Sequence, residues 1–138
     1  TALAVENKVV EKKAEPVKEV KKEIKKAWAG KGELKATVYF EFAVNELNDE
    51  SKASLDKMIG EISGGKIVLI GHTDNVGTAE NNERRGMQRA EAVKSYLESK
   101  GLKVDKIELS SKGEEAPIAS NANAQGRSKN RRVEVLLQ

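Results

Sequence analysis

The feature that most constrains the fold is the run KIVLIGH, residues 66–72. Its apolar residues follow one another without alternating polar positions, a pattern typical of a strand buried on both faces of a sheet. The turn ISGGK precedes the run, and the polar segment TDNVG follows it. We therefore expect a buried strand of an α/β fold here, with its carboxyl end at residue 72.

The flanking segments predict further strands and helices. ATVYFEF is rich in β-branched and aromatic residues and predicts a strand over about residues 36–42. A helix is expected from Asn48 or Asp49, since either residue can cap it, and a second helix over about 80–100. KIELSSKG and RRVEVLL predict two more strands, separated by a long loop with room for one short helix. The first helix has an apolar stripe of Leu55, Met58, Ile59 and Ile62.

This order of elements constrains the topology. Strand, helix, strand, helix, strand, loop and strand require at least one right-handed parallel crossover. The predicted fold class is therefore α/β, a two-layer sandwich with a mixed sheet and helices on one side.

The charge distribution separates the chain into two parts. Residues 1–35 carry ten Lys and six Glu, a net charge of +4, whereas residues 36–138 carry 15 Lys and Arg against 16 Asp and Glu, a net charge of −1. We predict a charged tether over 1–35, flexible or partly helical, and a globular domain over 36–138. A helix from Pro16 would be short, so it needs a partner surface. Residues 16–30 can therefore act as part of the tether, as an oligomer contact, or as part of the core.

Composition excludes several classes of function. The near-neutral domain does not favour nucleic-acid binding, which needs clustered positive charge. The chain has no Cys and one His, so neither a metal site nor a cofactor is predicted, and no catalytic residue is assigned. No apolar run approaches the roughly 20 residues of a membrane helix. Because the chain starts at Thr1 rather than Met, we expect a processed protein or a fragment whose missing N-terminal region can hold a membrane anchor.

A binding site is predicted where the buried strand ends. Asp74 follows that strand, and ligands of open α/β sheets bind at the carboxyl ends of strands. Asn82, Arg85 and Arg89 fall within an arc of about 60° on the next helix, beside its apolar stripe and at the margin of the core. An Asp accepts from an ammonium and an Arg forks onto a carboxylate, so together they suit a zwitterion such as an amino acid.

Structural interpretations of the same residues remain open. Asp74 can form only a local turn, and Arg89 can be solvated or pair with Glu80 or Glu83. His72 is interpreted as a strand-end histidine that is hydrogen-bonded locally. The segment Asn130 to Arg132 either flanks the last strand or ties it to the loops near the site.

The stretches GHTDNVGTAENNERRGMQRAEAV, GEEAPIASN and GRSKNRRVEV resemble the OmpA-like peptidoglycan-binding domain of outer-membrane proteins, peptidoglycan-associated lipoproteins and flagellar stators. The resemblance covers about residues 36–138 and implies a βαβαββ sandwich that binds peptidoglycan without cleaving it. It implies that Asp74 and Arg89 grip the diaminopimelate of the stem peptide, with Asn82 lining the same pocket. Thr73 belongs to the same TD motif and completes the expected ligand-binding set with Arg85.

Two positions depart from the family pattern. Arg85-Gly86 stands where the family often has Leu-Ser or Leu-Gly, which adds a cation beside the pocket. Ala43 stands where Asp or Asn is common, so any ligand contact from that loop would come from the backbone. The resemblance implies a periplasmic anchor, attached to the outer membrane or to an envelope complex. The alternative function is a periplasmic interaction or oligomerisation module that uses the N-terminal helix, and an enzyme is the third.

Overall fold

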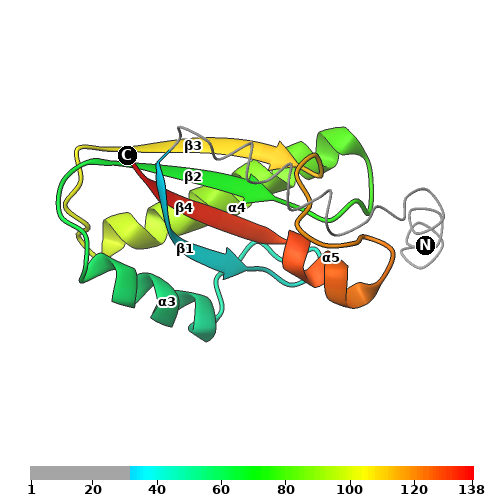
Figure 1. The fold of residues 1–138 in the computed structure, drawn as a ribbon, viewed down its shortest axis with the longest axis horizontal. Helices are drawn as coiled ribbons and strands as arrows, with labels where there is room; N and C mark the ends of the chain where they lie inside the picture. Colours follow the sequence, from blue (N-terminus) through cyan, green and yellow to red (C-terminus); the bar gives the residue numbers. More distant parts are fainter. Residues whose placement is uncertain (1–31) are drawn as a thin grey trace.

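A computed structural model describes residues 32–138 (Figure 1). The predicted helix from Pro16 and most of the predicted tether lie outside these residues. The chain order is β1 (Glu33–Tyr39), α3 (Asp49–Ile59), β2 (Lys66–His72), α4 (Ala79–Ser99), β3 (Lys106–Gly113), α5 (Ala124–Asn130) and β4 (Arg132–Leu137).

The four strands form one mixed sheet in the order β1-β4-β2-β3. β2 and β3 are parallel and α4 connects them, whereas β4 runs antiparallel to both β1 and β2. The predicted fold class, including the parallel crossover and the βαβαββ order, is confirmed. β2 lies inside the sheet, as its apolar sequence predicts.

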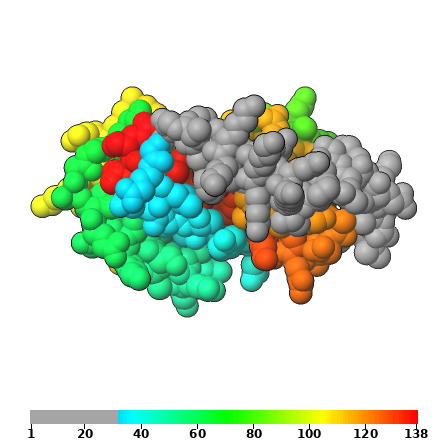
Figure 2. Space-filling view, in the orientation of Figure 1, coloured from blue at the N-terminus to red at the C-terminus, as the bar shows by residue number. Residues whose placement is uncertain are grey.

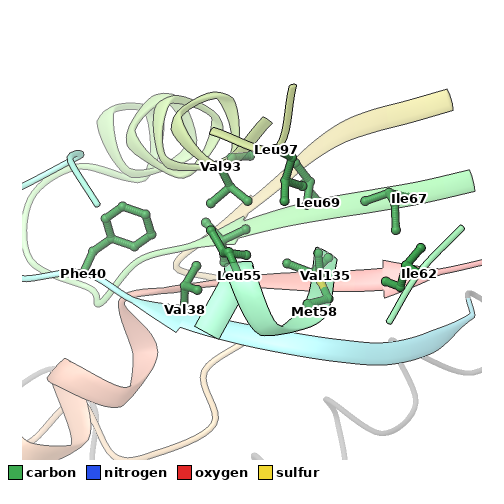
Figure 3. Packing of buried hydrophobic residues seen from close by; sticks show 12 residues of the cluster. Val38, Phe40, Leu55, Met58, Ile62, Ile67, Leu69, Val93, Leu97 and Val135 are labelled. Atoms are coloured by element: carbon green, nitrogen blue, oxygen red, sulfur yellow. The ribbon is translucent and has the colours of Figure 1, made fainter. Parts of the chain in front are cut away.

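Hydrophobic side chains fill the space between the sheet and helices α3 and α4. In Figure 3, Leu97 of α4 lies beside Leu69 of β2, and Val93 lies one turn along the helix. The opposite face of the sheet holds a smaller buried cluster of Val68, Ile70 and Leu136. β2 therefore contributes apolar side chains to both faces, which explains why its sequence does not alternate.

The predicted boundaries of two elements need correction. The first strand was expected over 36–42 but spans Glu33–Tyr39, because its length is set by pairing with β4 from Leu137 back to Arg132. Residues 33–35 of the predicted tether thus belong to β1. α3 ends at Ile59, before the expected stripe residue Ile62, and the following turn closes with a tighter bond from the Glu61 N–H to the carbonyl of Met58 at 2.9 Å.

The other helices expected within residues 36–138 are confirmed. The Asn48 side chain caps α3 by accepting from the N–H of Ser51 at 2.8 Å. α4 spans Ala79–Ser99, close to the predicted 80–100, and the long loop after β3 contains the short helix α5.

Candidate functional site

A contact between two glycines positions α4 on the sheet. A Cβ atom built on Gly71 would lie 1.8 Å from the carbonyl oxygen of Gly86, so only glycine at residue 71 allows this backbone approach. Asn82 and Arg89 lie about one helical turn on either side of Gly86. The close packing therefore carries both side chains to the carboxyl end of β2, the end of the sheet where α5 also lies (Figure 1).

Arg89 is fully buried, with 0% of its surface exposed. Its guanidinium donates from Nε to the carbonyl of Val44 at 3.1 Å, from Nη1 to that of His72 at 3.2 Å and from Nη2 to that of Glu41 at 3.3 Å. Its Cζ also lies 5.3 Å from the centre of the Phe40 ring. Arg89 thus joins the loop after β1 to the end of β2.

This geometry overturns three interpretations of Arg89. The side chain is neither at the margin of the core nor solvated, and it forms no ion pair with Glu80 or Glu83 within residues 32–138. The sequence could not reveal this, because the loop carbonyls that Arg89 satisfies are about 45 residues away along the chain.

Asp74 is also buried, with 2% of its surface exposed. Its Oδ1 accepts from the N–H of Val76 at 3.1 Å, which is the local turn considered above. Its Oδ2 accepts from Nη1 of Arg131 at 2.9 Å. The turn is therefore real, and the same carboxylate is ion-paired across the fold.

Arg131 also belongs to this site, although it was not among the ligand-binding residues expected from the sequence. Its Nε donates to the carbonyl of Phe40 at 2.9 Å while its Nη1 binds Asp74, so it ties the start of β4 to two loops. The NRR motif was the available signal, and the interpretation that it ties the last strand to these loops is confirmed for Arg131. A ligand can reach the Asp74 carboxylate only after neighbouring groups move, and Arg131 is in direct contact with it.

Positive charge exceeds negative charge around Asp74. Burial, and next the neighbouring cation Arg85, lower the pKa of Arg89 to about 10, while Asp74 opposes this shift and Arg131 adds to it. Arg89 therefore stays protonated at neutral pH. Asp74 is ion-paired with Arg131, while Arg85 and Arg89 add two further positive charges nearby, which favours an anionic group of a ligand.

Buried polar atoms near Asp74 lack partners within residues 32–138. Both side-chain atoms of Asn75 and the Oδ1 atom of Asn82 are buried and make no hydrogen bond there. The Asn82 amide nitrogen donates to Oε1 of Glu114 at 3.0 Å. Buried polar groups are rarely left unpaired, so these atoms mark a place where a ligand could complete the hydrogen bonding.

The other two predicted site residues have different surroundings. The Thr73 side chain is buried and donates from Oγ1 to the carbonyl of Asp74 at 2.7 Å, so it shapes the loop. Arg85 is half-buried on α4 and is the strongest charged influence on Arg89. Thr73 and Arg85 thus both lie at the predicted site. Arg85 is more accessible to solvent than the buried Arg89.

His72 is not hydrogen-bonded locally as predicted. Its Nε2 lies 2.6 Å from Oε1 of Glu134 on the neighbouring strand β4, and Arg132 donates from Nε to the other oxygen of Glu134 at 3.2 Å. Burial lowers the pKa of His72, and the hydrogen bond to Glu134 opposes this shift. The structural role expected of Asn130 is confirmed, since its side chain bonds the backbone at Ile118 and Ala119.

The described part of the chain contains neither a metal-binding cluster nor a membrane-spanning helix. Within residues 32–138, no group of three or more His, Asp or Glu side chains is arranged to hold a metal ion. In the same range no helix combines the length and the apolar character needed to cross a bilayer.

Comparison with known proteins identifies the family to which this chain is similar. The OmpA family profile matches residues 39–131. Outer membrane protein A of Bordetella avium is 37% identical over 87% of this chain and 63% of its own length. Peptidoglycan-associated lipoprotein of Pseudomonas aeruginosa is 41% identical over 72% of this chain and 60% of its own length. The chain thus spans about three fifths of these curated relatives.

Solved structures agree with the sequence matches. The peptidoglycan-associated lipoprotein from Burkholderia pseudomallei superposes with a TM-score of 0.67 at 30% identity, over 74% of this chain and 89% of that one. The cell wall anchor of the type VI secretion system of Pseudomonas aeruginosa gives a TM-score of 0.55 at 26% identity, over 73% of this chain and 78% of that one. On both the sequence and the structural matches, the chain belongs to the OmpA family.

Proposed function

We propose that this protein binds peptidoglycan noncovalently through the diaminopimelate of its stem peptide, and so anchors an envelope component to the cell wall. The observation that carries the proposal is the buried Asp74 carboxylate among Arg85, Arg89 and Arg131, beside unpaired amide groups. The relatives named for an association with peptidoglycan or for cell-wall anchoring support the same ligand class.

The proposed complex pairs each end of one zwitterion with an opposite charge. The ligand ammonium takes the place of Arg131 at Asp74, and the ligand carboxylate binds Arg89, assisted by Arg85. Asn82 and Asn75 supply amide groups that orient it. Charge-assisted hydrogen bonds of this kind are among the strongest that proteins make, and a guanidinium fits a carboxylate with two parallel bonds.

The family membership also bears on where the protein works. Because the related proteins are named for the outer membrane and the cell wall, we propose a periplasmic location with attachment to the outer membrane. This proposal requires no catalytic group, because noncovalent binding alone would attach the protein to the cell wall.

Titration calorimetry with three soluble stem peptides tests the proposal. One contains diaminopimelate, the second its amidated form and the third lysine at the same position. Lysine lacks the side-chain carboxylate, so Arg89 would be left unpaired and binding should weaken by about 1.5–3 kcal/mol, with amidation acting in the same direction. Equal affinities for the three peptides would mean that the site does not recognise the zwitterionic end of diaminopimelate.

A further inference from the structure

Arg85 is a cation on α4 that has no partner among the described residues. It is half-buried, and within residues 32–138 its guanidinium makes neither a hydrogen bond nor an ion pair. In Figure 2 the first turns of α4, in bright green, reach the surface beside the loop that follows β3, in orange. The site proposed around Asp74 therefore has, at its margin, an unpaired cation that a ligand can reach.

The packing of α4 fixes where Arg85 lies. Arg85 directly precedes Gly86, whose backbone carbonyl lies against Gly71 of β2. This contact holds the helix against the carboxyl end of β2. Since residues four apart lie one above the other on a helix, the Arg85 backbone is held about one turn from Arg89.

Arg85 and Arg89 are like charges at helical neighbour positions, an arrangement that is unfavourable without an anion to offset it. Burial, and next the charge of Arg85, lower the pKa of Arg89. Two nearby carboxylates are already engaged, because Asp74 is ion-paired and Glu114 accepts from the amide of Asn82. An anionic group of a ligand would offset the repulsion between the two arginines.

An unpaired acceptor beside Arg85 adds a second requirement. The Oδ1 atom of Asn82 is buried and has no donor within residues 32–138, while the amide nitrogen of the same side chain is used by Glu114. Asn82 and Arg85 are three residues apart, so their side chains are neighbours on the helix. Together they suit a carboxylate with an N–H group close to it, as occurs where a peptide bond adjoins a free carboxylate.

We propose that Arg85 is a specificity-determining residue that binds a second carboxylate of the stem peptide, separate from the side-chain carboxylate of diaminopimelate. The inference rests on the proposed function, which places diaminopimelate between Asp74 and Arg89. A guanidinium has five N–H groups and a carboxylate takes two of them, so Arg85 can assist Arg89 and still hold another anion. Two carboxylates offer this chemistry, that of the glutamate preceding diaminopimelate and that of the peptide C-terminus.

Titration calorimetry with three diaminopimelate stem peptides tests the inference. The first has both carboxylates free, the second has the glutamate carboxylate amidated, and the third has an amidated C-terminus. All three keep the diaminopimelate side chain, so its pairing with Asp74 and Arg89 is the same. One of the two amidations should weaken binding to the wild type about tenfold, the lower end expected for a hydrogen bond to a charged group. The amidation that does so identifies the carboxylate that Arg85 binds.

Matched variants separate Arg85 from a general effect of charge. Arg85→Gln should bind all three peptides with equal affinity, because the group that distinguishes them is gone. Arg84→Gln removes the same charge from the exposed neighbouring residue and should keep the wild-type difference. Thermal melts of both variants should match the wild type, because neither arginine has a partner within residues 32–138.

The outcomes distinguish this inference from the proposed function. If neither amidation weakens binding to the wild type, or if the loss persists in Arg85→Gln, the second carboxylate site is wrong while the diaminopimelate site stands. If Asp74→Asn binds the first peptide as well as the wild type does, the diaminopimelate site is wrong, and so is the inference that depends on it. Failure of the wild type to bind any of the peptides would reject both.

Discussion

Two buried clusters of charged side chains flank the carboxyl end of β2. They differ in how well the carboxylate is matched by its partners, so we call the cluster around Asp74 unbalanced and the cluster around Glu134 balanced. In the first cluster, Asp74 is outnumbered by arginines and nearby amide atoms lack partners. In the second, Glu134 binds both His72 and Arg132, so each of its oxygens is used, and within residues 32–138 only Nδ1 of His72 lacks a partner there. Burial of charge alone does not identify a ligand site. The Asp74 cluster combines additional positive charge with several buried amide atoms that lack partners within residues 32–138, and this combination supports it as the proposed ligand site.

Mutation of the balanced cluster should lower the free energy of unfolding more than mutation of the unbalanced cluster. Glu134→Leu would leave Arg132 as a buried cation without its carboxylate, and removal of one partner of a buried pair costs about 3–5 kcal/mol. Urea unfolding should show a loss of this size. The peptide affinity of the molecules that remain folded should be unchanged, whereas a large loss of affinity would mean that the two clusters are functionally coupled.

The unbalanced cluster should be the more sensitive in terms of binding. Asp74→Asn keeps the shape but removes the charge that would bind the ammonium of the proposed ligand, so the affinity for sacculi should fall by about 1.5–3 kcal/mol. Arg89→Lys should have a similar effect, because a lysine ammonium cannot form the planar fork. Sedimentation with purified sacculi measures both, and wild-type binding by both variants would place the site elsewhere.

Acid should weaken the balanced cluster through His72. Because burial lowers its pKa below the ordinary 6.5 despite the Glu134 bond, with Arg132 and Lys112 also opposing its protonation, the unfolded chain binds its proton first. The free energy of unfolding should therefore fall as the pH drops below about 6.5, by at most about 1.4 kcal/mol per pH unit from this residue. His72→Gln should show a shallower slope in urea titrations over that range. Equal slopes for the wild type and His72→Gln would contradict the assignment of this pH dependence to His72.

The smallest expected effect concerns the loop that Arg89 holds. Ala43 has a φ of 58°, in the left-handed region that costs most residues about 1–2 kcal/mol. Asn adopts this conformation more readily, so Ala43→Asn should raise the free energy of unfolding by about 0.5–1 kcal/mol. Thermal melts would detect the gain. A loss of stability instead would mean that an asparagine side chain cannot be accommodated at this position of the loop.

Much of the fold could be read from local patterns. The uninterrupted apolar run of β2, the cap at Asn48 and the stripe of α4 each reflect short-range rules of geometry and burial. The ends of β1 could not be predicted in this way, because β1 is as long as its pairing with β4 allows. Strand boundaries depend on a partner that lies far away in the sequence.

The sequence by itself determined the α/β class, and it pointed to the end of β2, with Asp74 and Arg89, as the place of the proposed site. Only the tertiary structure decided their partners. Arg131 reaches Asp74 across 57 residues of sequence, and Arg89 binds loop carbonyls 45 and 48 residues away. Periodicity reports which face of an element is apolar, whereas the pairing of buried charges depends on which distant segments the packed core brings within about 3 Å of each other.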